Sequence, residues 1–212
     1  TLPLNDSLSA PTPIPLMSGG FRWSLGRQRS AMLLVDAGGT TPLASIDKHR
    51  LVPLGECVPS WPGISGLSAI GGLEAGEPSR LWRWGGPPAA VAICYEISNG
   101  AALARAVADG AEWILAAANL DPYPRLLQQQ YLALAQLRSL ETARPLLSTA
   151  NTGPTAMIRA DGQIAARLAS FAPGVLMVPL QPRKGLTGYV RWGETPLLLM
   201  IGASSLVKIC RF

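Results

Sequence analysis

Two short apolar runs, each about as long as a buried strand, constrain the fold more than any other feature of the chain. They are AAVAIC at 89–94 and EWILAAAN at 112–119, and continuous runs of this kind are typical of strands buried on both faces. A helical segment at 99–111 lies between them, and the strongest helical periodicity in the chain follows at 125–144. This alternation of strands and helices predicts an α/β fold.

The remaining segments extend this pattern. Residues 30–37 predict an earlier strand, and three short strands are expected between 145 and 169, whereas the Pro- and Ser-rich residues 1–20 indicate irregular structure. In the long helix, apolar residues recur every three or four positions and predict the buried face. These residues are Leu127, Tyr131, Leu134 and Leu137.

Composition excludes several classes of function. The 212 residues suffice for one sizeable domain, and 48% of them are hydrophobic while only 15% are charged. The net charge is +5, but the basic residues are scattered and not interleaved with aromatic ones, so we expect no nucleic-acid partner. One histidine and three cysteines, at spacings that fit neither a disulfide framework nor a zinc site, predict no metal centre.

The C-terminal segment is unusually apolar. Residues 195–207 carry no charge, and Lys208 and Arg211 follow. Thirteen residues fall short of the roughly 20 that a membrane-spanning helix requires. Two interpretations stay open: a last core strand, or a short membrane helix followed by a basic tail on the cytoplasmic side.

Cys94 is the first candidate for chemistry. It ends the run 89–94 and directly precedes a helical segment, and open α/β sheets place ligands and nucleophiles at such strand ends. A helix N-terminus would favour the thiolate, which is the reactive form of cysteine. Two interpretations of Cys94 stay open at this point: a nucleophile held in its ionised form, or a free cysteine packed in the core.

A nucleophilic cysteine needs a partner that accepts its proton or stabilises charge in the site. The two candidates are adjacent: Lys48 and the sole histidine, His49, in the stretch DKHRLVP. On an extended segment neighbouring side chains point to opposite faces, so only one of the two can face the thiol. Spacing alone does not choose between them.

Four stretches, in this order, resemble one protein family. They are IDKHRLVPLGECVP at 46–59, AICYE at 92–96, RSLETARPLLSTANTGPTAMI at 138–158 and GLTGYVRWGE at 185–194. With them the chain resembles the nitrilase (carbon–nitrogen hydrolase) superfamily and, more narrowly, the apolipoprotein N-acyltransferases of bacterial envelopes. The resemblance implies a four-layer α-β-β-α sandwich, a pocket at one edge of the paired sheets, and no cofactor.

The resemblance also implies catalytic roles. The superfamily uses a Glu-Lys-Cys triad, which makes Cys94 the nucleophile and Lys48 its partner in stabilising the oxyanion of the tetrahedral intermediate. Glu56 matches a second carboxylate of the acyltransferase pattern and is expected to orient Lys48 or the incoming amine.

Three further residues match supporting positions. Tyr95 and Glu96 follow the nucleophile, and Glu96 is expected to anchor the cysteine turn through hydrogen bonds. Asn119 is retained in AANLDPYPR, where the family usually has Ser-Asn-Asp-Ala-Trp-Phe-Gly. We expect this departing loop to border the acyl pocket.

The triad's general base is expected upstream of Thr1, because TLPL resembles the residues that directly follow that glutamate in the family. We therefore expect residues 1–194 to be a catalytic domain that lacks its first strand and its base, and to be inactive as given. In this division, residues 195–212 are the segment expected to form the short membrane helix and its basic tail.

The implied activity is N-acyl transfer at the periplasmic face of a bacterial inner membrane. A phospholipid would donate its fatty acyl chain to the cysteine, and the N-terminal amine of a lipoprotein would accept it. Two alternatives stay open: a soluble nitrilase-type amidase that hydrolyses a small amide, and a non-catalytic envelope scaffold of the same fold.

Overall fold

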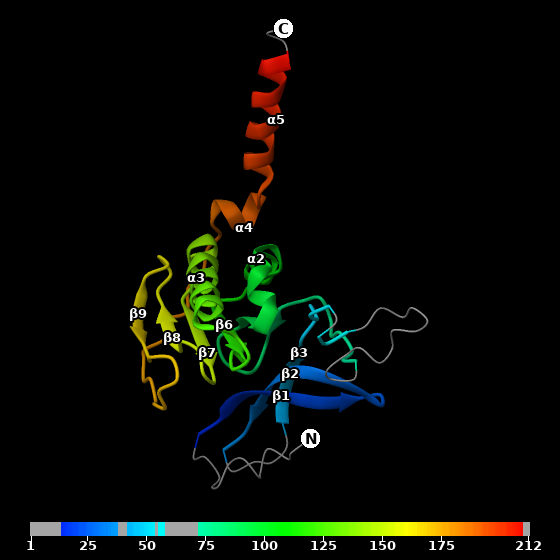
Figure 1. Cartoon of the computed structure of the whole chain (residues 1–212), viewed down its shortest axis with the longest axis vertical. Coiled ribbons are helices and arrows are strands. Elements are labelled where there is room, and N and C mark those ends of the chain that lie inside the picture. The colour runs from blue at the N-terminus through cyan, green and yellow to red at the C-terminus, as the bar shows by residue number, and fades with distance from the viewer. Residues whose placement is uncertain (1–13, 38–41, 54, 58–71, 210–212) are drawn as a thin grey trace.

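The computed structural model describes residues 14–37, 42–53, 55–57 and 72–209, with the side chains of the last helix described only to 201 and at 203. Two sheets lie one against the other, and helices cover the second sheet (Figure 1). The elements are β1 (Leu16–Ser24), β2 (Arg27–Val35), β3 (Pro42–Asp47), β4 (Leu81–Trp82), β5 (Ala89–Ile93), η1 (Cys94–Ser98), α2 (Gly100–Ala108), β6 (Trp113–Ala118), α3 (Arg125–Thr142), β7 (Leu146–Ala150), β8 (Ala156–Ile158), β9 (Ile164–Arg167), α4 (Gly188–Trp192) and α5 (Thr195–Ile209).

The larger sheet has six strands in the order β4-β5-β6-β7-β8-β9. Its centre is parallel, since β5 pairs with β6 and β6 with β7 in that sense, while the outer strands are antiparallel. The two apolar runs predicted from the sequence are the neighbouring strands β5 and β6. Their carboxyl ends therefore meet at one edge, where the sequence places Cys94 and Asn119.

Both faces of this sheet are buried, which explains the continuous apolar runs. Ala92 and Ala116 face a core shared with α2 and α3. Val91 and Leu115 face the opposite way, into a second core that contains Met32 of β2. Because each face has its own apolar partner, polar alternation along these strands is absent.

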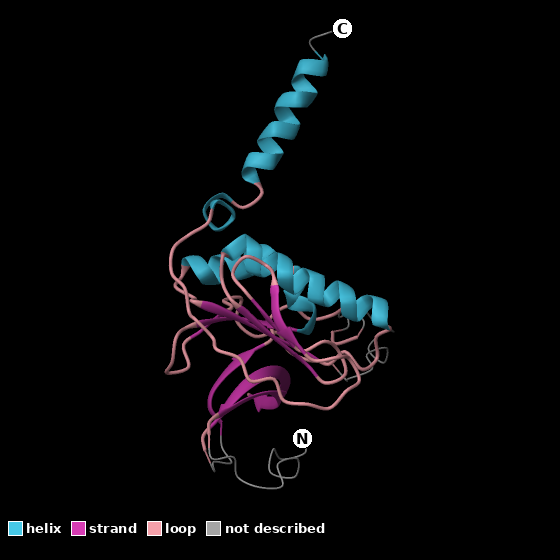
Figure 2. Cartoon of the chain, turned by 90° about the vertical axis from the view of Figure 1, so that its left-hand side faces the viewer, coloured by secondary structure: helices cyan, strands magenta, loops and turns pink. Residues whose placement is uncertain are grey.

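The smaller sheet is antiparallel, in the order β1-β2-β3. Figure 2 shows the resulting stack of helices, six-stranded sheet and three-stranded sheet. The described residues thus supply three layers of the predicted four-layer sandwich. No helix in the described part of the chain covers the outer face of the three-stranded sheet.

Two expectations about secondary structure were wrong. Residues 1–20 were expected to be irregular, but β1 begins at Leu16 because its residues pair with β2 along nine positions. The alternative of a last core strand for 195–207 is also wrong, because this segment belongs to the helix α5. Its leucines, methionine and alanine favour a helix, and proline is tolerated in the first turn.

The buried face of α3 matches the apolar spacing only in part, since Tyr131 is buried and Leu134 packs against the core. Leu127 and Leu137 are 44% and 42% exposed, whereas Gln128 and Arg138 are buried. The polar side chains are accommodated because they bond to backbone carbonyls; for example, Ser139 donates to the Arg144 and Arg159 oxygens. The apolar spacing identified the helix. Which of its faces is buried depends also on the polar side chains that bond to backbone carbonyls.

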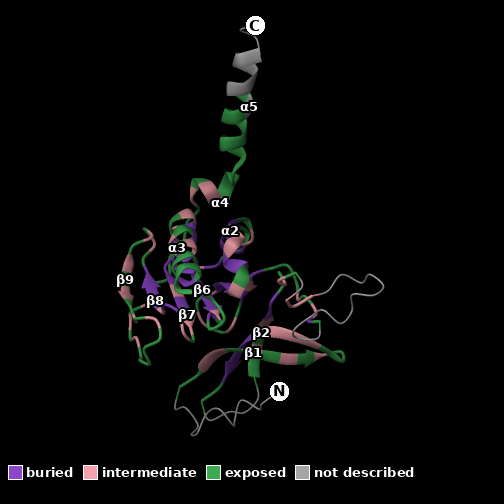
Figure 3. Cartoon of the chain, in the orientation of Figure 1, coloured by how far each residue is buried: buried purple, intermediate pink, exposed green. Residues whose placement is uncertain are grey.

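The C-terminal helices stand apart from the two cores. The short α4 leads into α5, which rises away from the sheets, and the described side chains of α5 are exposed (Figure 3). Among the helices described, none has the combination of length and apolar composition needed to cross a bilayer. The membrane interpretation of 195–212 stays a prediction.

The start of α2 provides a stability test. Asn99 is the N-cap, and its side chain accepts a hydrogen bond from the Ala102 amide at 3.2 Å. Replacing Asn99 by Ala should lower the free energy of unfolding by about 1 kcal/mol, since it removes this acceptor. Urea unfolding measures the change, with Asn99→Asp as the control that keeps a capping oxygen. Equal stability of Asn99→Ala and the native chain would contradict the capping role.

Candidate active site

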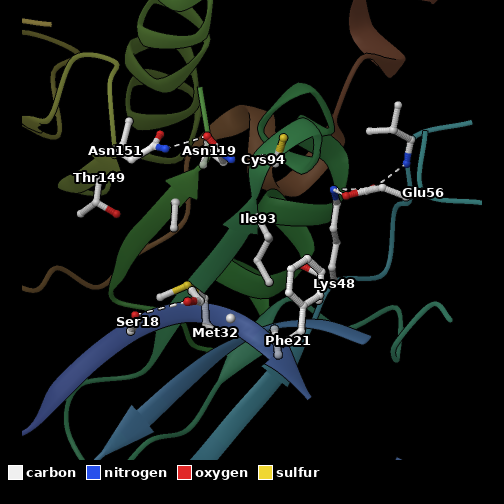
Figure 4. A pocket seen from close by; sticks show the side chains of 18 of the residues that line it. Ser18, Phe21, Met32, Lys48, Glu56, Ile93, Cys94, Asn119, Thr149 and Asn151 are labelled. Carbon is white, nitrogen blue, oxygen red and sulfur yellow. Dashed lines mark hydrogen bonds and ion pairs between the residues drawn. The ribbon is translucent and has the colours of Figure 1, made fainter. Parts of the chain in front are cut away.

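Cys94 sits at a sharp turn between β5 and the 3₁₀ helix η1. Its φ angle is 53°, in the left-handed region that residues other than glycine rarely adopt. Such a conformation costs on the order of 1–3 kcal/mol and persists only where surrounding contacts hold it. The turn directs the Cys94 side chain into a pocket at the edge of the six-stranded sheet (Figure 4).

Lys48 reaches the same pocket from the end of β3. Its side chain is 1% exposed, and its Nζ lies 2.6 Å from each carboxylate oxygen of Glu56. Glu56 also accepts a hydrogen bond from the Val52 amide at 2.8 Å, which fixes the carboxylate. The pair therefore presents an oriented ammonium group beside Cys94.

The neighbouring His49 faces the other way. Its ring Nδ1 lies 2.7 Å from the Gly76 carbonyl oxygen, and the residue is exposed. Lys48 lines the pocket and His49 does not. The geometry thus resolves the choice that spacing left open, because only the lysine can reach a substrate near Cys94.

Glu96 holds the cysteine turn in place. It is 3% exposed, and its carboxylate accepts hydrogen bonds from the amides of His49, Arg50 and Ile93 at 2.8, 3.0 and 2.9 Å. One side chain thereby ties the strand that carries Cys94 to the segment that carries Lys48. The anchoring role expected of Glu96 stays a prediction, and these hydrogen bonds support it.

Arg80 completes this arrangement and was not identified from the sequence. Its guanidinium is buried and lies 3.1 Å from both oxygens of Glu96. It also donates to the carbonyl oxygens of Asp47 and Glu77 at 2.8 and 2.7 Å. A buried carboxylate requires such a partner, but nothing in the local sequence distinguishes Arg80 from the exposed basic residues.

The pocket has a volume of about 690 Å³ and two chemically different sides. One side is apolar and comes mostly from β1, β2 and the end of β5. Its main side chains are Met17, Phe21, Met32 and Ile93. The other side carries neutral polar groups at the ends of β6 and β7, namely Asn119, Thr149 and Asn151.

The two other supporting residues differ in position. Asn119 lines the pocket, whereas the Tyr95 ring does not and is 42% exposed, with the Arg50 guanidinium 4.8 Å from its centroid. The Tyr95 backbone, however, favours the ionised form of the neighbouring Cys94 thiol and so lowers its pKa. Tyr95 thus contributes to the site through its main chain.

Burial disfavours the ionised form of Cys94 that the sequence led us to expect. Burial raises the pKa of the Cys94 thiol above its usual value, because it disfavours the charged thiolate. The Lys48 charge opposes this shift, and the Glu56 charge adds to it. Activation of this thiol therefore requires a group that accepts its proton.

Comparison with known proteins identifies the family. The model of the carbon-nitrogen hydrolase family matches residues 19–185. The chain therefore belongs to the carbon–nitrogen hydrolase family. Among the described residues, no group of three His, Cys, Asp or Glu side chains could hold a metal ion.

Curated relatives are more specific. An apolipoprotein N-acyltransferase of Prochlorococcus marinus (strain MIT 9313) is 61% identical over 199 residues, which are 93% of this chain and 40% of that protein. One of Parasynechococcus marenigrum (strain WH8102) is 58% identical over 185 residues, or 85% of this chain and 39% of that protein. The chain thus spans about two fifths of the length of these relatives.

Solved structures support the sandwich architecture. An amidase from Nesterenkonia sp. superimposes with a TM-score of 0.63 at 19% identity, covering 87% of this chain and 66% of the amidase. A glutamine-dependent NAD+ synthetase from Acinetobacter baumannii gives 0.59 at 14% identity, covering 80% and 35%. At these identities the likeness shows the fold alone.

The raised pKa of Cys94 can be tested by the pH dependence of iodoacetamide alkylation, which follows the thiolate fraction. We expect a midpoint above about 8.5, the usual value of a free cysteine. Lys48→Met should move the midpoint further up, because it removes a charge that stabilises the thiolate, and Glu56→Gln should move it down. His49→Gln is the matched control. If Lys48→Met and Glu56→Gln shift the midpoint in the same direction, the opposite effects assigned to these two charges on the pKa of Cys94 are wrong.

Proposed function

We propose that this chain is the catalytic domain of an apolipoprotein N-acyltransferase. In this role it moves a fatty acyl chain from a phospholipid, through a thioester on Cys94, to the N-terminal amine of a bacterial lipoprotein. The observation that carries the proposal is Cys94 and the Lys48–Glu56 pair in one pocket with an apolar side. The 61% identity to a protein named as such an enzyme supports the same conclusion.

The reaction has two half-steps. The Cys94 sulfur attacks the ester carbonyl carbon, a carbon–sulfur bond forms, and the carbon–oxygen ester bond breaks as the lysophospholipid leaves with a proton. The lipoprotein amine then attacks the thioester, a carbon–nitrogen bond forms, and the sulfur leaves and regains a proton. Each half-step passes through a tetrahedral oxyanion, which the Lys48 ammonium stabilises.

Glu56 has a positioning role in this scheme. Both of its oxygens bond to the Lys48 ammonium, so it fixes the direction in which that charge points. Since burial raises the pKa of the Cys94 thiol, its attack on the ester carbonyl needs a base that accepts the proton. The glutamate of the Glu-Lys-Cys triad that the family resemblance implies would be that base.

The apolar side of the pocket suits the acyl chain. Met17, Phe21 and Met32 line the same pocket as Cys94 and offer flexible and aromatic surface. An acyl chain that fills this space would also exclude water, and exclusion of water favours attack by an amine over hydrolysis.

The proposed location is the periplasmic face of the bacterial inner membrane. Both substrates are anchored in a membrane, so a catalytic domain that acts on them must lie at its surface. Residues 1–194 would then form the catalytic domain, and 195–212 a membrane-associated segment. The exposed apolar side chains of α5, such as Leu198 and Leu199, are consistent with this division.

The test of the proposal is a mass measurement on the product of the complete reading frame. After incubation with phosphatidylethanolamine vesicles, the peptide containing Cys94 should gain the mass of one acyl group. Cys94→Ser should abolish turnover to a lipopeptide amine. No adduct on the native protein would favour a scaffold, and turnover of small soluble amides without lipid would favour an amidase.

The partner of Cys94 can be tested by two adjacent substitutions. Lys48→Arg should lower acyl transfer by more than about 10²-fold, because the larger planar cation cannot keep both bonds to Glu56 while it faces the oxyanion. His49→Gln should be mild, since the His49 ring faces away from the pocket. The reverse ranking in single-turnover assays would exclude Lys48 from its assigned role.

A further inference from the structure

Asn119 and Asn151 form a fixed pair at the polar side of the pocket. Asn119 follows the end of β6 and Asn151 follows the end of β7, so the parallel pairing of these strands brings the two residues together. The Asn151 Nδ2 donates to the Asn119 Oδ1 at 2.7 Å. The parallel pairing of β6 with β7 therefore places these two side chains side by side.

Backbone amides determine which end of each side-chain amide points where. The Leu120 amide donates to the Asn151 Oδ1 at 3.0 Å, which leaves the Asn151 Nδ2 to face Asn119. The Asp121 amide donates to the Asn119 Oδ1, also at 3.0 Å. Because a backbone N–H can only donate, both side-chain orientations follow without ambiguity.

The Asn119 Oδ1 thus accepts two hydrogen bonds, whereas the Nδ2 of the same side chain donates to none of the described residues. No described residue accepts a hydrogen bond from the Asn119 Nδ2, and the residue is exposed where it lines the pocket. The described contacts therefore leave a preoriented neutral donor with two available hydrogens at the pocket wall.

The position of this donor relative to Cys94 is informative. In Figure 4, Asn119 and Asn151 lie on one side of Cys94, and Lys48 with Glu56 lies on the other. The Lys48 ammonium already shares its hydrogens with the Glu56 carboxylate. An acyl carbonyl bound above the sulfur would meet a cation from one side and an amide donor from the other.

We propose that the Asn119 side chain donates a hydrogen bond to the carbonyl oxygen of the acyl group at Cys94, and that Asn151 is a positioning residue that holds it. This inference rests on the proposed acyl transfer. The ligand class is an acyl carbonyl, in an ester or thioester, whose oxygen becomes negative as the tetrahedral intermediate forms. A fixed neutral donor stabilises that oxygen at little reorganisation cost.

Single-turnover acylation from phosphatidylethanolamine vesicles, followed by mass on Cys94, tests the proposal in the complete reading frame. Asn119→Ala should lower the acylation rate by about 10²-fold, the loss typical of one oxyanion donor. Asp121→Ala is the matched control, because this exposed side chain lies outside the pocket lining and the variant keeps the Asp121 amide. It should leave the rate unchanged.

The role of Asn151 has its own readout. Asn151→Ala should lower the rate by about tenfold through the loss of Asn119 orientation, and the double variant should equal Asn119→Ala alone. Losses that multiply in the double variant would show that Asn151 acts independently and would overturn its positioning role.

A second measurement separates catalysis from folding. Alkylation of Cys94 by iodoacetamide forms no oxyanion, so its rate should be unchanged in Asn119→Ala while acylation falls. Loss of both rates together would mean that the substitution disturbs the site as a whole and would overturn the proposal. If the native protein and Asn119→Ala are acylated at the same rate, the role proposed for Asn119 is wrong while the proposed acyl transfer stands. If native protein forms no adduct, the proposed function itself fails.

Discussion

The Glu96 carboxylate, buried against the Arg80 guanidinium, is the interaction on which the site depends. It receives the amides of His49 and Ile93, and so joins the segment after β3 to the end of β5. These segments belong to different sheets, and no backbone ladder connects them at this point. The left-handed turn at Cys94 can persist because this buried ion pair holds both of its sides.

The same burial shapes the chemistry of the thiol. Burial disfavours a free thiolate, so the pKa of Cys94 rises; in the proposed mechanism it also strengthens the attraction between the Lys48 ammonium and a developing oxyanion. A resting thiol is compatible with catalysis when proton removal accompanies attack on the carbonyl. In the proposed mechanism the Lys48–Glu56 pair therefore stabilises the intermediate.

Much of the fold could be predicted because short apolar runs and helical spacing indicate individual strands and helices. The runs at 89–94 and 112–119 gave two adjacent parallel strands, and the spacing in 125–144 gave a helix. Local patterns failed where a partner distant in sequence decides the outcome. The rotation of α3 is an example, since Gln128 is buried to bond the Leu120 and Tyr123 carbonyls while Leu127 stays exposed.

The sequence by itself determined the residue types of the site, since Cys94, Lys48, Glu56 and Asn119 stand in recognisable stretches and all line one pocket. Only the tertiary structure decided that Arg80 is a buried partner of Glu96, and that the Asn151 side chain donates a hydrogen bond to Asn119. The physical reason is that hydrogen-bond direction and the burial of a charge depend on groups brought together from separate strands, and spacing along one segment carries no information about them.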